Sequence, residues 1–357
     1  MDLSAVEKIV NAVLYEGYIL YPYRASAVKN RQRFNFGAIY PIAYSESQGG
    51  MEPASMQTQC ILTGSAETTL DIRVRFLHLA AREVGKLGSS LPRLPLSEPD
   101  YQVVDSLEIG GKMFHTWQEA VEREVESSGI VVGDLLSNGP RLLMFEFPSV
   151  RNVEPLTADD GKIPAVLVRT QGQLAGVVEV EAEAIGENAF KLTVRIRNLA
   201  TLVREELASR DVALMRSLVS AHTVMGVTGG AFVSSFDTPE QYKAAVAGCQ
   251  NVGTWPVLVG NAGECNCMLS SPIILYDYPE IAPESAGDLF DGTEIDEILT
   301  LRIMSLTDDE KREMRSVDER ARRILDRTES LSPEDMMRLH GTVRGMRRVQ
   351  SVEGDGQ

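Results

Sequence analysis

The chain has 357 residues, of which 43% are hydrophobic and 24% are charged, so it can form two or three globular units of about 150 residues each. Its formal net charge of −16 repels phosphate backbones and anionic membrane surfaces, and 6% aromatic content is low for a surface that stacks bases. We therefore expect neither nucleic acid nor membranes as partners. No motif predicts a cofactor.

The N-terminal residues, Met1–Lys8, show no basic segment followed by an apolar run, and no stretch of about 18 apolar residues occurs in the sequence. The four cysteines are too few to crosslink a chain of this length. We therefore expect a cytoplasmic protein with reduced thiols.

A basic, aromatic stretch follows an amphipathic helix that apolar spacing predicts over 3–15. Its cations are Arg24, Lys29, Arg31 and Arg33, and its aromatic residues are Tyr21, Tyr23, Phe34 and Phe36. Cations beside aromatic faces can bind a carboxylate or a phosphate, so the four cations are candidate ligand-binding residues. Alternatively, they pair with the chain's own carboxylates, and the aromatic residues belong to the core.

Strands and then a helix are predicted in the next part of the chain. The runs 58–63 and 70–79 read as two strands, which could form a hairpin across the glycine-containing segment between them. Thr116 and Glu119 form a capping-box pattern, in which each side chain satisfies a free backbone donor, so a helix is predicted over 116–125.

The middle of the chain is predicted to be rich in strands. Residues 141–148 read as a buried strand, and the alternating runs 175–182 and 190–197 flank a strong hairpin signal. Helix formers then predict a helix over 202–219. The glycine cluster at 226–230 lacks the lysine and hydroxyl residue of a phosphate loop, so we expect a turn or bulge there.

Capping residues and prolines organise the region that follows. Thr238 and Pro239 predict a helix that runs to about residue 247. The apolar runs 256–259 and 272–276 both open with proline, which is tolerated as the first residue of a strand, and both are predicted to be strands.

An acidic segment lies between Tyr276 and Leu299, with eight carboxylates and no lysine or arginine. Close carboxylates repel one another by roughly 1 kcal/mol per pair in water, and a basic partner would relieve this repulsion. The candidate partner-binding residues are Asp277, Glu280, Asp288, Asp291 and Glu294. The alternative is a solvated acidic loop. The spacing does not follow the alternating pattern of a calcium loop.

The C-terminal part is predicted to be helical. Thr307 and Glu310 form a capping box that opens a helix to about residue 328, and Ser332 opens a shorter one. The predicted fold class is α+β, with antiparallel sheet or sandwich modules, peripheral helices and a helical C-terminus. We divide the chain into an N-terminal α+β region at 1–138, a β-rich region with the acidic segment at 139–305, and a C-terminal helical extension at 306–357.

Neither the cysteines nor the histidines form a recognisable site. Structural zinc sites space paired cysteines by two to four residues, whereas Cys265 and Cys267 are separated by one. No metal is therefore predicted, and Cys249, Cys265 and Cys267 are the thiols to test. His222 lies between the helix predicted over 202–219 and a strand predicted over 224–233, where it can serve as a general base, and it is the catalytic candidate. The alternative is a structural histidine.

Two stretches carry a family resemblance: LYEGYILYPYRASAVKNRQRF at 14–34 and SPIILYDYPEIAPESAGDLFDGTEIDEILT at 271–300. There and over most of its length, the chain resembles an uncharacterised family of bacterial proteins associated with nickel–iron hydrogenase gene clusters. The resemblance implies a cytoplasmic accessory or assembly role, with hydrogenase subunits or maturation factors as partners. It implies no catalytic residues, and the C-x-C cysteines do not belong to the family's pattern.

Two functional hypotheses follow. The first is a non-catalytic accessory protein that binds another protein during metalloenzyme (hydrogenase) maturation, through the acidic segment or the basic, aromatic stretch. The alternative is an enzyme acting on an anionic small molecule, bound by the cations between Arg24 and Arg33, with His222 as general base. The sequence leaves a homo-oligomer open.

Overall fold

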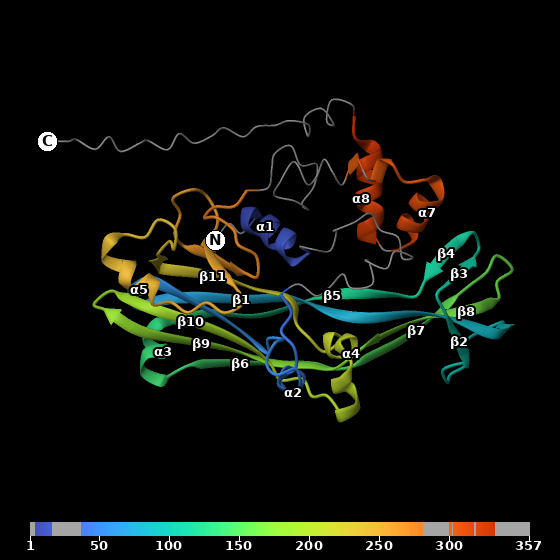
Figure 1. The fold of residues 1–357 in the computed structure, drawn as a ribbon, viewed down its shortest axis with the longest axis horizontal. Coiled ribbons are helices and arrows are strands. Elements are labelled where there is room, and N and C mark those ends of the chain that lie inside the picture. The colour runs from blue at the N-terminus through green and yellow to red at the C-terminus, as the bar shows by residue number, and fades with distance from the viewer. Residues whose placement is uncertain (1–3, 16–36, 281–299, 302, 318, 333–357) are drawn as a thin grey trace.

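The computed structural model describes residues 4–15, 37–280, 300–301, 303–317 and 319–332. It confirms the predicted α+β fold, because a large antiparallel sheet carries a few helices, including a helical region towards the C-terminus. The molecule is elongated, and α1 (Ser4–Leu14), α7 (Asp308–Val317) and α8 (Glu319–Ser330) lie on one side of the long strands (Figure 1).

The sheet is organised around β1 (Ser55–Leu91), which pairs with five other strands and runs along much of the molecule (Figure 1). The other strands of this sheet are β2 (Tyr101–Val104), β5 (Trp117–Val131), β6 (Arg141–Phe147), β7 (Val150–Leu156), β8 (Ile163–Gln171), β9 (Leu174–Gly186), β10 (Ala189–Asn198), β11 (Val219–Phe232), β12 (Trp255–Leu258) and β13 (Cys267–Ser271). A separate two-stranded sheet is formed by β3 (Ser106–Ile109) and β4 (Lys112–His115).

Short helices connect the strands. They are α2 (Ile42–Ser47), α3 (Val132–Asn138), α4 (Arg210–Leu214), α5 (Lys243–Ala247) and the 3₁₀ turns η2 (Arg204–Ala208) and η3 (Glu240–Tyr242). None of the helices in the described part of the chain has the length and the apolar run needed to cross a bilayer.

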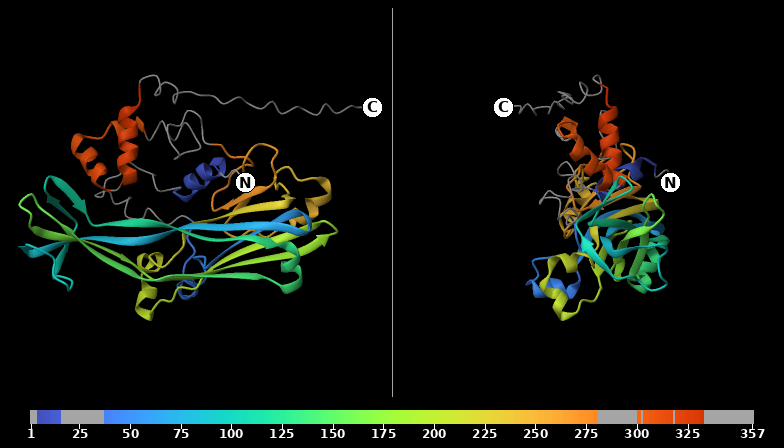
Figure 2. Two further views of the ribbon diagram at one scale, coloured as in Figure 1. Left: turned by 180° about the vertical axis from the view of Figure 1, so that it is seen from behind. Right: turned by 90° about the vertical axis from the view of Figure 1, so that its right-hand side faces the viewer.

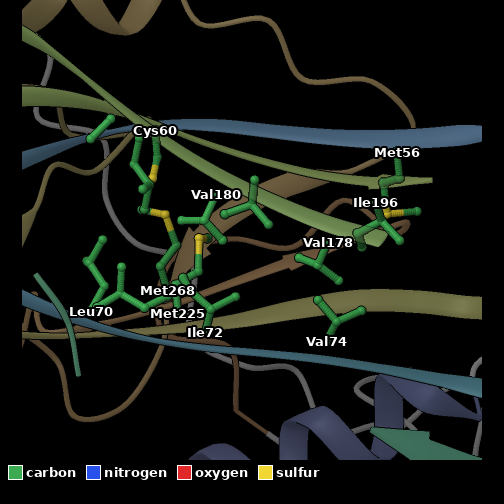
Figure 3. Close-up of a cluster of buried hydrophobic side chains, with 14 of the residues drawn as sticks. Met56, Cys60, Leu70, Ile72, Val74, Val178, Val180, Ile196, Met225 and Met268 are labelled. Carbon is green, nitrogen blue, oxygen red and sulfur yellow. The ribbon is translucent and has the colours of Figure 1, made fainter. Parts of the chain in front are cut away.

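The main hydrophobic core lies between β1, β9, β10 and β11 (Figure 3). Its labelled members are Met56, Cys60, Leu70, Ile72, Val74, Val178, Val180, Ile196, Met225 and Met268. Phe76 of β1 is fully buried, and its ring centroid lies 5.8 Å from that of Phe145 and 6.0 Å from that of Phe147. Aliphatic and aromatic residues from distant parts of the sequence thus pack together in one hydrophobic core.

The amphipathic helix predicted at the N-terminus is confirmed as α1. Its buried residues Val6, Val10 and Val13 pack in a cluster that includes Val257 of β12. Glu7, on the same helix, forms an ion pair with Arg75 of β1 at 3.3 Å. The helix therefore covers one face of the sheet through both apolar contacts and an ion pair (Figure 2).

The capping box at the start of α7 is also confirmed. The Thr307 amide donates to Glu310 Oε2 at 2.8 Å, and the Glu310 amide donates to Thr307 Oγ1 at 3.3 Å. The predicted single helix to about residue 328 is instead two helices, because α7 ends at Val317 and α8 begins at Glu319. Met314 of α7 is fully buried in a cluster that contains residues of both helices and of β1.

The helix predicted over 116–125 is wrong, because this segment forms β5 and pairs with β1 from Thr69 to Arg82. Trp117, Val121 and Val125 are spaced by four residues, which fits one face of a strand as well as one face of a helix. The Thr116 hydroxyl does not cap a helix. It donates to the Val104 carbonyl at 2.6 Å and accepts from the Val84 amide at 3.0 Å.

The hairpin predicted between 58–63 and 70–79 is also wrong, because both runs belong to the continuous strand β1. The segment between them shifts the register of pairing with β11 instead of reversing the chain. Thr68 fixes this bulge, since its hydroxyl accepts from the Ser65 amide at 2.9 Å and donates to the Gly229 carbonyl at 2.9 Å.

Two further predictions are corrected. The helix expected over 202–219 is reduced to η2 and α4, because Ser209 caps α4 and Leu218 is already paired with Ile39 in a β-bridge. The strand expected over 272–276 is irregular, and β13 ends at Ser271, whose hydroxyl donates to the Ile273 carbonyl at 3.0 Å.

Several predictions in the middle of the chain are confirmed. The strand at 141–148 is β6, although none of its residues is buried, and the hairpin at 175–197 is formed by β9 and β10. The glycine cluster lies in β11, with Gly229 at a positive φ of 76°. The helix after Pro239 consists of η3 and α5, and the run opened by Pro256 lies in β12.

The sheet crosses the first predicted regional boundary, since β1 pairs with β8, β10 and β11 from the second region. The division into three regions stays a prediction. The second helix expected after Ser332 lies outside the described residues.

Candidate protein-docking surface

Most of the predicted binding residues lie outside the residues that the structure describes. They are Arg24, Lys29, Arg31, Arg33, Asp288, Asp291 and Glu294. Two predicted partner-binding residues are described, and they differ: Glu280 is exposed, whereas Asp277 is partly buried and hydrogen-bonded inside the protein.

The catalytic candidate His222 is fully buried on β11, where it pairs with Arg75 of β1. Its Nδ1 lies 2.9 Å from the Ser220 carbonyl oxygen. Burial lowers the pKa of His222 to about 4, and the nearby Arg75 and Arg73 act in the same direction. The ring is therefore neutral at physiological pH and has no contact with solvent.

The cysteine candidates are all free thiols and do not converge. Cys265 packs against the main core, whereas Cys267 is buried in the cluster beneath α1. Within the described residues, no group of three or more His, Cys, Asp or Glu side chains is placed to hold a metal ion. Within the described residues, Cys265 and Cys267 therefore do not form a metal site together with another His, Cys, Asp or Glu side chain.

An exposed apolar surface lies at the end of the molecule that carries α5 and β12 (Figure 1). It consists of Phe236 and Tyr276, which are 54% and 78% exposed, and we call these two residues the aromatic patch. Ile274, which is 69% exposed, belongs to the same chain segment as Tyr276. The rings of Phe236 and Tyr276 contact each other, with centroids 5.5 Å apart. Large apolar side chains that gather on a surface mark sites of interaction more reliably than scattered ones do.

The sequence places these side chains at the outer edge of the sheet. β12 is the last strand in the sheet order, so none of the strands that the structure describes pairs with its outer side. The chain after β13 returns along this edge: Asp277 Oδ1 accepts from the Leu258 amide at 2.8 Å, and the Tyr278 amide donates to the Leu258 carbonyl at 2.7 Å. These bonds fix the position of Tyr276, the residue before Asp277.

Asp277 also holds the loop that carries Phe236. The Ser234 hydroxyl donates to Asp277 Oδ2 and accepts from the amides of Phe236 and Asp237 at 3.0 and 2.8 Å. One carboxylate thus joins the two loops of the aromatic patch. The structure shows Asp277 positioning these loops, and its contact with a partner stays a prediction.

The surroundings of the aromatic patch are acidic. Residues 231–280 contain five carboxylates, Asp237, Glu240, Glu264, Asp277 and Glu280, and a single lysine, Lys243. That lysine pairs with Glu240 at 2.6 Å. The chain segment that carries the aromatic patch is therefore acidic in sequence.

A concave region lies between the β3–β4 hairpin, β7, β8 and α7. Figure 1 shows these elements at the end of the molecule opposite to α5. Its volume is about 810 Å³. We call it the charged groove, and its lining includes Arg82, His115, Glu154, Arg169, Arg312 and Ser316.

The charges of the groove are largely engaged with one another. Glu119 accepts from Arg82 and from Arg169, each at 2.8 Å, and Arg169 also pairs with Glu154 at 2.8 Å. His115 Nε2 lies 3.1 Å from Ser316 Oγ of α7. Burial lowers the pKa of His115, which favours the neutral ring. These contacts join the sheet to the C-terminal helices and leave few charges for a ligand.

Sequence reasoning missed the aromatic patch, because the run at 272–276 reads as a buried strand. The available signal was Ser234 followed by Asp237, a turn pattern next to an aromatic residue. No protein-family model matches the chain, and a search among curated proteins found no match.

Proposed function

We propose that this chain is a non-catalytic accessory protein that binds a partner protein through the aromatic patch. The observation that carries the proposal is the exposed ring pair of Phe236 and Tyr276, which Asp277 and Ser234 hold in place. Interfaces concentrate their binding energy in a few aromatic anchors, and preorganised loops lower the entropy lost on binding.

The charge around the patch supports a partner with a basic surface. Carboxylates at the rim of an interface steer an oppositely charged protein and speed its association. The partner is expected to surround an apolar pocket with lysine or arginine. The family resemblance makes a hydrogenase subunit or a maturation factor the candidate, with assembly in the cytoplasm as the setting.

The expected loss of affinity on removing an aromatic anchor is large enough to measure. Truncation of a central aromatic anchor typically weakens binding by about 2–4 kcal/mol, which corresponds to a factor of about 30 to 1,000 in the dissociation constant. Removing both rings of the patch is therefore expected to abolish capture under ordinary washing conditions.

The proposal is tested by affinity purification from a native extract, followed by mass spectrometry. The wild type is compared with a Phe236→Ala, Tyr276→Ala double variant. The matched control is Leu142→Ala, Met144→Ala, which removes side chains that are 54% and 67% exposed on β6. We expect one protein, near stoichiometric with wild type and control, to be lost from the patch variant. Equal recovery with the folded patch variant would refute the proposal.

A further inference from the structure

A small cavity beneath α5 brings three sulfur-containing side chains together. Cys60 of β1, Cys249 after α5 and Met268 of β13 all line it, and its volume is about 40 Å³. Figure 3 shows Cys60 and Met268 within the same buried cluster. The remaining walls include the aliphatic residues Ile61 and Val246. A space of this size holds about one water molecule or one ion.

Backbone pairing explains why the two cysteines meet. Gln57 and Val252 form an antiparallel bridge, with reciprocal bonds of 3.1 and 2.8 Å. If this register is continued, Cys60, three residues after Gln57, comes opposite Cys249, three residues before Val252. Residues directly opposite in an antiparallel pair have Cβ atoms about 5 Å apart.

Side-chain bonds keep this alignment but separate the two chains. Asn251 Oδ1 accepts from the Gln59 amide at 2.7 Å, and Gln59 Oε1 accepts from the Gln250 amide at 2.8 Å. Between the Gln57–Val252 bridge and Cys249, side chains therefore replace the direct hydrogen bonds between the two backbones. This separation accounts for a cavity at a position where close strands would have none.

The charge state of the site favours neutral thiols when it is empty. Burial raises the pKa of Cys60, and the neighbouring Cys249 adds to the effect. Burial also raises the pKa of Cys249, while the Lys191 ammonium opposes this rise. Lys191 lies on β10, and its ammonium already pairs with Glu183 at 2.6 Å.

We propose that this cavity binds one soft monovalent cation of the Cu(I) class through the Cys60 and Cys249 sulfurs and the Met268 thioether. Thiolate and thioether donors select soft cations. The third donor of this site is the thioether of Met268, so the site is not a group of three His, Cys, Asp or Glu side chains. Binding one Cu(I) releases two protons, one from each thiol, transfers no electron and leaves a site charge of −1.

The test measures Cu(I) binding by the reduced full-length chain without oxygen, in competition with the chromophoric chelator bicinchoninate. Native mass spectrometry gives the number of ions bound. Cys249→Ser removes a thiol from a half-buried position, and Met268→Leu removes the thioether with little change in volume. Cys265→Ser is the matched control, since Cys265 does not line the cavity. Circular dichroism and melting curves check that each variant folds.

We expect one Cu(I) per wild-type chain. Affinity should fall by at least about 100-fold in Cys249→Ser and by about 10-fold in Met268→Leu, and stay within about 2-fold in Cys265→Ser. Failure of the wild type to compete for Cu(I), or wild-type affinity in a folded Cys249→Ser variant, would overturn the proposal. Recovery of a Cys60–Cys249 disulfide, with no Cu(I) binding after its reduction, would overturn it as well.

Discussion

The aromatic patch and the charged groove lie at opposite ends of one sheet and use their side chains in opposite ways (Figure 1). The groove has the larger hollow, about 810 Å³, yet its carboxylates and guanidinium groups pair within the chain. The patch encloses no such volume, but Phe236 and Tyr276 expose more than half of their surface. In this molecule, exposed apolar side chains therefore indicate a binding surface better than the volume of a cavity does.

The two ends also differ in what holds them. Exposed ion pairs contribute about 0–1 kcal/mol each, so pairs such as Arg315–Asp326 add little to the stability of α7 and α8. Buried apolar residues must hold these helices on the sheet. At the other end, a single carboxylate, Asp277, joins the two loops of the patch. This contrast predicts which substitutions affect stability and which affect binding.

The largest expected effect lies in the hydrophobic cluster beneath α7, the helix that lines one side of the charged groove. Met314→Ala removes a fully buried side chain of α7 and should lower the free energy of unfolding by about 2–5 kcal/mol. Met304→Ala, at a position that is 49% exposed, is the control and should change it by less than about 0.5 kcal/mol. Urea unfolding measures both. Equal small effects would mean that ion pairs, not apolar packing, hold α7.

Low pH is expected to lower the free energy of unfolding through two buried histidines of the sheet. Burial lowers the pKa of His78 and of His222 to about 4, and nearby arginines act in the same direction. In the unfolded chain both pKa values return to about 6.5, so unfolding takes up protons between pH 6.5 and 4. Stability is complete above pH 6.5 and falls towards pH 4, by up to about 3 kcal/mol per histidine.

The measurement is urea unfolding at pH 7.5, 5.5 and 4.5. His222→Gln should lower the stability at pH 7.5 but reduce its dependence on pH, because the substituted side chain does not titrate. An unchanged slope between pH 6.5 and 4 in the His222→Gln variant would show that His222 does not titrate in this range.

A smaller effect is expected at the patch. Asp277→Ala leaves the Leu258 amide and the Ser234 hydroxyl without their acceptor and should lower stability by about 2 kcal/mol. Glu280→Ala, at an exposed position three residues later, should have an effect below about 0.5 kcal/mol. Thermal melting compares the two variants. If they melt alike, Asp277 does not position the loops.

Sequence patterns predicted the fold class and many elements, and the errors share a cause. Helix α1 and the hairpin of β9 and β10 depend on local periodicity, which the sequence contains. Trp117, Val121 and Val125 fit both helix and strand periodicity, and only the long-range pairing of β5 with β1 decides between them. The same holds for β1, whose partner strands lie between residues 101 and 232.

The site was harder to predict than the fold. The charge of Asp277 predicts a partner contact, but its bonds are to Ser234 and Leu258, and only the folded chain brings these residues near it. The exposure of Tyr276 follows from its place beyond the last strand of the sheet, which no local pattern reveals. Cys60 and Cys249 are 189 residues apart in sequence, so no spacing rule relates them.

The most direct test of the docking proposal is the affinity of the purified partner for the wild type, the Phe236→Ala, Tyr276→Ala variant and the Leu142→Ala, Met144→Ala control, measured by calorimetry. We predict that the patch variant binds at least about 100-fold more weakly while the control binds within about 2-fold of the wild type. Wild-type affinity in a patch variant that melts normally would contradict the proposal.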